Sequence, residues 1–252
     1  MSANAPAWLV ARPIAHRGLH DAAKGVVENT LGAAEAAIRG GFAIECDVQL
    51  SCDGEAMVLH DDTLGRLTRA RGAVSEKTVA EIQAAAFRDG EERAPTFPQL
   101  LARVAGRTPL ICELKSRFDG DMRLAERVAA LAREYDGPLA IKSFDPAPIA
   151  HLRALSPGIG PLGMVAEASY SGRNWRDLSA AQKEACAVFL HYPETRPDFL
   201  SWSVDDLPHP TPFLLRRLEG LPVMTWTVRT AEQRRKASRW ADQIVFEGET
   251  AA

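Results

Sequence analysis

Eight short apolar segments, separated by stretches of helical character, constrain the fold of this chain more than any other feature. Several are apolar nearly throughout, which is typical of strands covered on both faces in a parallel sheet. Eight strands with helices between them fit a closed TIM (β/α)8 barrel, and the main competing architecture is an open doubly wound sheet. The predicted strands are Pro13–His16, Ala43–Leu50, Pro109–Lys115, Pro138–Phe144, Gly160–Glu167, Asp198–Val204, Pro222–Val228 and Asp242–Glu247.

Helix-start and helix-stop signals support this alternation of strands and helices. Asn29 or Thr30 can cap a helix over Leu31–Arg39, and Gly40 is suited to end it. Helices of this length are typical of barrel crossovers. The other predicted helices are Arg123–Tyr135, Pro146–Leu155, Ser179–Leu190, Thr211–Leu218 and Thr230–Trp240.

One long segment interrupts the regular spacing. Residues 61–98 carry many charges and only a weak helix signal, around Lys77–Ala86. An excursion of this length between two strands is usually functional or disordered. We therefore predict a small insertion after the second strand, over one end of the barrel. A chain of 252 residues is of ordinary size for one barrel, so we expect a single domain over residues 1–252.

Composition excludes several classes of partner. A formal net charge of −3 gives no general attraction to nucleic acid or to anionic membranes, so anion recognition must be local. No apolar run reaches the roughly 20 residues of a membrane span, and no export signal opens the sequence. Four scattered cysteines are predicted to be reduced thiols. We expect a cytoplasmic protein that binds a small-molecule substrate, with no nucleic-acid partner and no stable membrane insertion, and we predict no oligomeric state.

Acidic side chains gather on the second and third predicted strands. Successive side chains in a strand point to opposite faces, so Glu45 and Asp47 share one face, and Glu113 lies in the third strand. Like charges this close cost free energy unless a cation, a proton or a basic group lies between them. Oxygen ligands without cysteine or paired histidine favour a hard cation over zinc. The sequence predicts one divalent cation, Mg²⁺ or Ca²⁺. The simpler alternatives are a solvated strand face for Glu45 and Asp47 and an ion pair with Lys115 for Glu113.

Basic and titratable groups lie at the ends of the first and third predicted strands and after a short apolar run, and the ends of barrel strands are where the chemistry of such folds is found. His16 and Arg17 end the first strand, Lys115 ends the third, and His60 follows the apolar run Met57–Leu59. Arg17 and Lys115 can donate to a phosphate. The two imidazoles can serve as general base and general acid near neutral pH. Together these groups indicate metal-assisted phosphoryl transfer, most simply phosphodiester hydrolysis.

An ordered series of short motifs resembles the glycerophosphodiester phosphodiesterases. The resemblance extends from about residue 13 to residue 246. It implies a TIM-type barrel with a small insertion after the second strand, a divalent cation, and hydrolysis of glycerophosphodiesters to sn-glycerol 3-phosphate and an alcohol, as part of lipid and glycerol metabolism. The matching motifs are HisArgGly at 16–18, GluAsnThr at 28–30, GluCysAspVal at 45–48, SerCysAspGly at 51–54, HisAsp at 60–61, GluLeuLys at 113–115, SerPheAsp at 143–145 and TrpThrVal at 226–228.

The resemblance also implies a role for each polar residue. It does not decide which histidine is the base, nor whether the nucleophile is water or the neighbouring glycerol hydroxyl. The implied roles are catalysis by His16 and His60 and metal binding by Glu45, Asp47 and Glu113. Arg17 and Lys115 are implied to contact the phosphate. Glu28 and Asn29 are implied to brace the metal site, with Asn29 also at the phosphate, and Trp226 to line the pocket.

Two positions depart from the family's motifs. Arg229 follows TrpThrVal, where the family often has Asn, and residues 245–247 are ValPheGlu where the family has an IleThrAsp-like segment. We expect neither position to contact the metal or the histidines, and both to alter the rim of the pocket. Substrate preference is therefore less constrained by the sequence than reaction type.

Two alternative functions remain open at this point. A phospholipase D-like activity on lysophospholipids would need an apolar entrance, which Phe87, Phe97 and Phe118 could form. A noncatalytic barrel that only binds phosphodiesters would not need both His16 and His60, because binding requires no proton transfer. The segment Tyr170–Pro197 carries no motif, and we expect it to pack on the surface.

Overall fold

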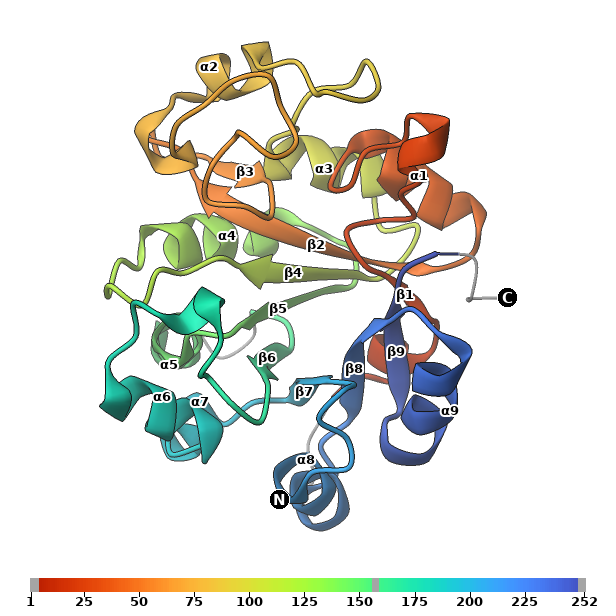
Figure 1. The fold of residues 1–252 in the computed structure, drawn as a ribbon, viewed down its shortest axis with the longest axis vertical. Helices are drawn as coiled ribbons and strands as arrows, with labels where there is room; N and C mark the ends of the chain where they lie inside the picture. The colour runs from red at the N-terminus through yellow and green to blue at the C-terminus, as the bar shows by residue number, and fades with distance from the viewer. Residues whose placement is uncertain (1–4, 156–158, 249–252) are drawn as a thin grey trace.

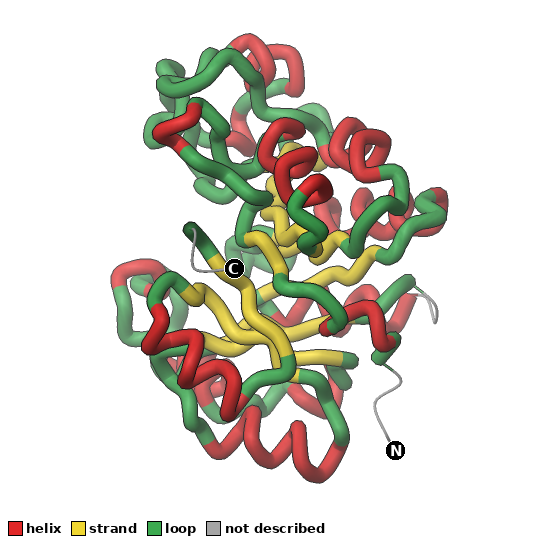
Figure 2. Tube along the Cα trace, turned by 90° about the vertical axis from the view of Figure 1, so that its right-hand side faces the viewer, coloured by secondary structure: helices red, strands yellow, loops and turns green. Residues whose placement is uncertain are grey.

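The computed structural model describes residues 5–155 and 159–248, and over these residues eight parallel strands close into a barrel with helices around it (Figures 1 and 2). The ring order is β1-β9-β8-β7-β6-β5-β4-β2, and β2 pairs with β1. The predicted barrel is confirmed and the open sheet is excluded. Each strand lies within its predicted range: β1 (Ile14–Ala15), β2 (Ala43–Leu50), β4 (Leu110–Leu114), β5 (Leu139–Ser143), β6 (Leu162–Ala166), β7 (Phe199–Ser203), β8 (Val223–Val228) and β9 (Gln243–Phe246).

The helices between the strands also agree with the predicted ones, except for α3 and the short α7. The Thr30 hydroxyl accepts a hydrogen bond from the Ala33 N–H and caps α1, as expected. Helix α3 was missed, although Thr96 and Gln99 form a capping box at its start. The helices are α1 (Leu31–Arg39), α3 (Phe97–Val104), α4 (Arg123–Glu134), α5 (Pro146–Leu155), α6 (Ala180–Ala187), α7 (Tyr192–Thr195), α8 (Pro210–Leu214), continued by a π-helical turn (Leu215–Glu219), and α9 (Ala231–Trp240).

The segment after β2 packs around apolar side chains of its own. Strand β3 (Ala56–Val58) runs antiparallel to β2, and the weak predicted helix is observed as α2 (Val79–Ala84). Figure 1 places α2 and the loops around it beyond β3, at the top of the view. Val27, from the loop before α1, joins the buried apolar cluster of this part, whose other members are Met57, Leu59, Leu64, Val74, Ile82, Ala85, Phe87 and Ala94.

Side chains fill the barrel interior in layers, and this layering positions the site. One buried apolar layer is formed by Ile14, Ala43, Ile111, Ala140, Phe199, Met224 and Val245. Because every second residue of a strand faces the same side, the next interior layer lies two positions further along each strand. That layer contains His16, Glu45, Glu113, Lys142, Trp226 and Glu247. On most of these strands, the inward-facing side chain is therefore apolar in the first layer and polar two residues later.

Two further expectations concern the cysteines and the membrane. Cys46, Cys52, Cys112 and Cys186 are all free thiols, as expected. Within the described residues, no helix combines the length and the apolar character that crossing a bilayer requires.

Candidate active site

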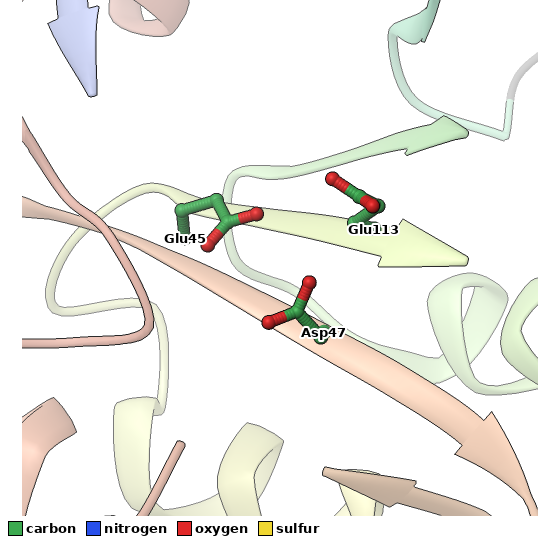
Figure 3. Close-up of side chains that lie close together, drawn as sticks. All are labelled: Glu45, Asp47 and Glu113. Atoms are coloured by element: carbon green, nitrogen blue, oxygen red, sulfur yellow. The ribbon is translucent and has the colours of Figure 1, made fainter. Parts of the chain in front are cut away.

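Three carboxylates meet inside the barrel because β2 and β4 are neighbours in register. Asp47 is paired with Glu113 across the two strands, and Glu45 lies two residues before Asp47 on the same face. Oxygens of the three residues lie within 4.8 Å of one another, and Figure 3 shows the carboxylates converging on one space. Their exposed fractions are 0% for Glu45, 1% for Asp47 and 4% for Glu113. Buried carboxylates at this density need positive charge between them.

Two lysines provide part of that charge. The Lys115 ammonium lies 2.9 Å from Asp47 Oδ1 and 2.5 Å from Glu113 Oε1. The Lys142 ammonium, from β5, lies 2.9 Å from Glu45 Oε1 and 3.3 Å from Glu113 Oε2 and is only 2% exposed. Sequence reasoning did not assign Lys142 to the site. The signal was a lysine inside an apolar strand, two positions after the buried Ala140.

The donor set fits a divalent cation of the hard class. All three candidate ligands are carboxylates, which suits Mg²⁺ or Ca²⁺. Glu45 Oε1 and Asp47 Oδ1 are buried and accept no hydrogen bond of ordinary geometry, although each lies 2.9 Å from an ammonium. Burial favours protonation of Asp47, but Lys115, His60 and Arg17 outweigh burial and hold its pKa well below the usual range. These cationic neighbours therefore favour the carboxylate form, which is the form that binds a metal ion.

The loop after β1 supports this cluster from one side. Arg17 and Gly18 both have positive φ angles, 56° and 77°, and this turn directs the Arg17 N–H to Glu45 Oε2 at 3.1 Å. The Arg17 guanidinium donates to Glu28 at 2.7 Å and lies 3.4 Å from Asp47. Its position beside Asp47, a candidate metal ligand, places a fixed positive charge at the edge of the site.

Asn29 braces Asp47 with both atoms of its amide group. Its Nδ2 donates to Asp47 Oδ2 at 3.0 Å, and its Oδ1 accepts from the Asp47 backbone N–H at 3.2 Å. Asn29 is 3% exposed and has a left-handed backbone conformation, φ 58°, which asparagine tolerates better than most residues. The bracing contact expected from the GluAsnThr motif is present, and the amide group is occupied by Asp47.

His16 contacts a residue that we expected to lie away from the histidines. Its Nδ1 lies 2.5 Å from Glu247 Oε1, and its Nε2 lies 4.0 Å from Glu45 Oε2. Glu247 Oε2 accepts in turn from Arg229 Nε at 2.7 Å. Burial opposes ionisation of Glu247, but His16 and Arg229 lower its pKa to about 2. The expectation that neither departure from the family's motifs contacts the histidines was wrong for Glu247, whereas Arg229 is linked to His16 through Glu247.

His60 has a carboxylate partner of the same kind. Its Nδ1 lies 2.8 Å from Asp61 Oδ1, and Arg66 donates both to Asp61 and to Glu28. Burial opposes ionisation of Asp61, but hydrogen bonds from His60 and Arg66 lower its pKa well below the ordinary value. An imidazole whose Nδ1 donates to a carboxylate keeps Nε2 for chemistry. Arg66 thus binds the carboxylate partners of both His60 and Arg17.

A hollow of about 780 Å³ opens above the carboxylates. Its lining includes His16, Arg17, His60, Glu113, Lys115, Lys142 and Trp226, while Glu45, Asp47 and Asn29 lie beneath. The structure therefore brings together the nine residues that the sequence assigned to catalysis, metal binding or substrate binding. A larger hollow of about 1000 Å³ beside α3 contains none of them.

Aromatic residues line the wall of the hollow that includes Trp226. The Phe144 ring centroid lies 5.4 Å from that of Trp226 and 4.9 Å from that of Trp175, and the Phe118 ring centroid lies 6.2 Å from that of Trp175. The expected apolar entrance does not form as predicted, because Phe87 and Phe97 are buried elsewhere. Trp175 lines the hollow, although we expected its segment to pack on the surface.

Known proteins provide an independent comparison. The model of the glycerophosphoryl diester phosphodiesterase family matches residues 16–246. A glycerophosphodiester phosphodiesterase of Caldanaerobacter subterraneus is 32% identical over 154 residues, which are 57% of this chain and 62% of that relative. The Bacillus subtilis protein YhdW is 30% identical over 190 residues, 71% of this chain and 73% of that protein.

A solved structure shares the architecture. The phosphodiesterase of Oleispira antarctica, solved in complex with its product sn-glycerol-3-phosphate, superimposes with a TM-score of 0.77 at 21% identity and covers 95% of this chain and 93% of that one. This likeness supports the fold. Since the family model spans nearly the whole chain, the protein belongs to the glycerophosphoryl diester phosphodiesterase family.

Proposed function

We propose that the protein hydrolyses glycerophosphodiesters to sn-glycerol 3-phosphate and an alcohol, with the help of one divalent cation. The observation that carries the proposal is the arrangement of His16 and His60. Each imidazole has its Nδ1 at a carboxylate, and both line the hollow above the buried carboxylates. A protein that only bound phosphodiesters would need no such pair, because binding requires no proton transfer.

Glu45, Asp47 and Glu113 would hold the cation, Mg²⁺ or Ca²⁺. When bound, it supplies positive charge that stabilises the phosphoryl oxygens as negative charge develops on them. Arg17 and Lys115 extend this positive charge along the floor of the hollow and would orient the phosphate. The proposed role of Asn29 is to hold Asp47 in place, because both polar atoms of its amide group are already bound there.

His16 and His60 would share the two proton transfers. One imidazole accepts the proton of the attacking hydroxyl group, and the other donates a proton to the departing alcohol oxygen. The attacking group is either water or the neighbouring glycerol hydroxyl, which would form a cyclic phosphate. The same two imidazoles serve both routes, since opening of the cyclic phosphate reverses their roles. Detection of a cyclic glycerol phosphate by phosphorus NMR during turnover would identify the second route.

A lysophospholipase D-like reaction is the second candidate. The aromatic wall of Phe118, Phe144 and Trp175 favours it, because such a surface can contact an acyl chain as well as a headgroup. The chemistry at the phosphate would be unchanged. Only the group attached to the glycerol would differ between the two substrates.

Purified protein incubated with glycerophosphocholine or with lysophosphatidylcholine separates these functions. We expect release of sn-glycerol 3-phosphate and choline from the first substrate, lost on addition of a chelator and lost in His16→Ala and His60→Ala. His151→Ala is the matched control, because His151 lies on α5 outside the hollow and pairs with Glu126. Turnover of lysophosphatidylcholine alone would favour the second candidate. Tight binding of glycerophosphocholine without turnover would contradict both.

The domain organisation and the location are part of the same proposal. We propose one domain over residues 1–252, in which 61–98 form a small insertion that contributes Arg66 to the site. We also propose a cytoplasmic location, because all four cysteines are free thiols, which is typical of proteins in a reducing compartment.

A further inference from the structure

Glu247 and Arg229 form a chain of contacts that ends at His16. Arg229 Nε donates to Glu247 Oε2 at 2.7 Å, and Glu247 Oε1 lies 2.5 Å from His16 Nδ1. The Glu247 side chain is 20% exposed and that of His16 is 11% exposed, so this contact is largely shielded from water. The two positions at which the chain departs from the family's motifs are therefore in contact with each other and with a candidate catalytic imidazole.

The barrel fixes where these residues lie. Ile14 and Val245 are paired in register on β1 and β9, and both belong to the apolar interior layer. His16 and Glu247 follow two positions later on the same strands, and the His16 N–H donates to the Phe246 carbonyl at 3.0 Å. Both backbones are thus held before the side chains meet. A carboxylate at position 247 can reach Nδ1 without any movement of the loop.

We propose that Glu247 is a positioning residue for His16, and that Arg229 holds Glu247 in the orientation this requires. Oε1 accepts the proton on Nδ1, so the neutral imidazole keeps one tautomer, with Nε2 as its free acceptor toward the Glu45 side of the site. Arg229 fixes the other oxygen of Glu247. Without that contact the carboxylate could turn to His20, whose Nε2 already lies 4.0 Å from Oε1.

The second histidine supports this assignment independently. His60 Nδ1 has a carboxylate partner in Asp61, and an arginine, Arg66, binds that carboxylate. The His16 partners come from β9 and the end of β8, whereas the His60 partners come from the segment after β2. Two separate parts of the chain thus form the same series of contacts, in which a histidine binds a carboxylate and the carboxylate binds an arginine. A carboxylate partner that orients a functional imidazole has measurable effects even though it does not touch the substrate.

The test compares Glu247→Gln and Glu247→Asp with the unchanged protein. Gln keeps the size of the side chain but loses its charge and its pairing with Arg229, whereas Asp keeps the charge. We expect Glu247→Gln to lower kcat on glycerophosphocholine about 10- to 100-fold, with KM changed less than about threefold, and Glu247→Asp to recover part of the loss. Glu35→Gln is the matched control, because Glu35 pairs with Arg107 away from the hollow.

A spectroscopic measurement tests positioning directly. We expect 15N NMR at a pH where His16 is neutral to show one tautomer, protonated on Nδ1, in the unchanged protein. Glu247→Gln should give a mixture of tautomers, and Arg229→Gln should change the same signals to a smaller extent. The Glu35→Gln control should leave them unchanged.

The kinetic part of this inference rests on the proposed function, but the spectroscopic part does not. If the unchanged protein fails to hydrolyse glycerophosphodiesters, the proposed function fails, and the tautomer comparison still decides the role of Glu247. A Glu247→Gln variant with the same tautomer and the same kcat as the unchanged protein would overturn the inference. If Glu247→Gln does not fold, Arg229→Gln provides the comparison, and an unchanged tautomer together with an unchanged kcat in that variant would overturn the inference.

Discussion

Replacing Lys142 with methionine tests whether buried positive charge holds the carboxylate cluster together. Met is apolar, has a similar length and suits an irregular interior site. The change removes the ammonium that lies 2.9 Å from Glu45 Oε1 and 3.3 Å from Glu113 Oε2. Lys115 remains, but it contacts Asp47 and Glu113 and leaves Glu45 without a lysine partner.

The expected loss of stability follows from the burial of these groups. Lys142 is 2% exposed and Glu45 is 0% exposed, so water cannot replace the lost partner. Removing one member of such a buried ion pair typically costs about 3–5 kcal/mol. In a protein of this size each kcal/mol lowers the melting temperature by about 2–4 °C, so Lys142→Met should lower Tm by roughly 6–20 °C in chelator.

A divalent cation should recover more stability in the variant than in the unchanged protein. A ligand at 100 times its Kd stabilises a folded protein by about 2.7 kcal/mol, and a tighter site gives a larger effect. The cation replaces the missing positive charge in Lys142→Met, whereas it meets an existing ammonium in the unchanged protein. Thermal unfolding with chelator and with graded Mg²⁺ or Ca²⁺ measures both effects.

Lys77→Met removes a half-buried lysine that pairs with Glu81 in the segment after β2, and we expect no change in Tm. If Lys142→Met melts at the temperature of the unchanged protein in chelator, Lys142 does not neutralise the cluster. Equal cation-induced shifts in the two proteins would contradict the idea that ammonium and cation act on the same carboxylates.

Three further substitutions give separable results. Asn29→Ala leaves buried polar atoms of Asp47 without partners, so we expect a loss of about 1–3 kcal/mol in denaturant unfolding and roughly 10-fold weaker cation binding in a titration. Gly18→Ala would place a Cβ 2.8 Å from the Ala33 Cβ at a φ of 77°, and we expect a destabilisation of about 1–3 kcal/mol. Burial works against ionisation of Glu247, but its cationic partners His16 and Arg229 lower its pKa from 4.5 to about 2. The contribution of Glu247 to the free energy of unfolding is therefore complete above about pH 4.5 and is lost as the pH falls toward 2. Glu247→Gln should show a smaller loss of stability than the unchanged protein over that pH range.

The parts of the site that could be predicted depend on local rules. The two-residue period of a strand places Glu45 and Asp47 on one face, whatever the rest of the fold. In a (β/α)8 barrel, consecutive barrel strands are neighbours, so the third predicted strand, which contains Glu113, lies beside the second. Both rules operate within or between consecutive elements, and the carboxylate cluster is therefore visible in the sequence.

The contacts that the sequence did not predict are made between parts of the chain that are far apart in sequence or lack a regular period. Glu247 meets His16 because the last strand closes against the first, and the register of that closure, Ile14 against Val245, is not encoded in either strand alone. Trp175 lies in the irregular segment after β6, where no period indicates which way a side chain points. Lys142 could have been found, because it stands in an apolar strand two positions after Ala140, and a lysine there requires an anionic partner.

The charges at the floor of the hollow link cation binding to substrate binding. Three carboxylates, Glu45, Asp47 and Glu113, face the three cationic groups of Arg17, Lys115 and Lys142, so their formal charges cancel. A divalent cation makes this cluster positive by two charges, and a phosphate ligand in the hollow reduces that excess. Since coupling between two ligands is reciprocal, sn-glycerol 3-phosphate should tighten cation binding as much as the cation tightens its binding.

Calorimetric titration of Mg²⁺ or Ca²⁺ with and without saturating sn-glycerol 3-phosphate measures this coupling. We expect about 5- to 150-fold tighter cation binding in its presence, the range that a coupling of about 1–3 kcal/mol gives. Glycerol, which has the same hydroxyl groups but no phosphate, is the matched control and should leave cation affinity unchanged. Cation affinity that does not depend on sn-glycerol 3-phosphate would mean that the phosphate binds away from the carboxylates, and the roles proposed for Arg17 and Lys115 would then be wrong as well.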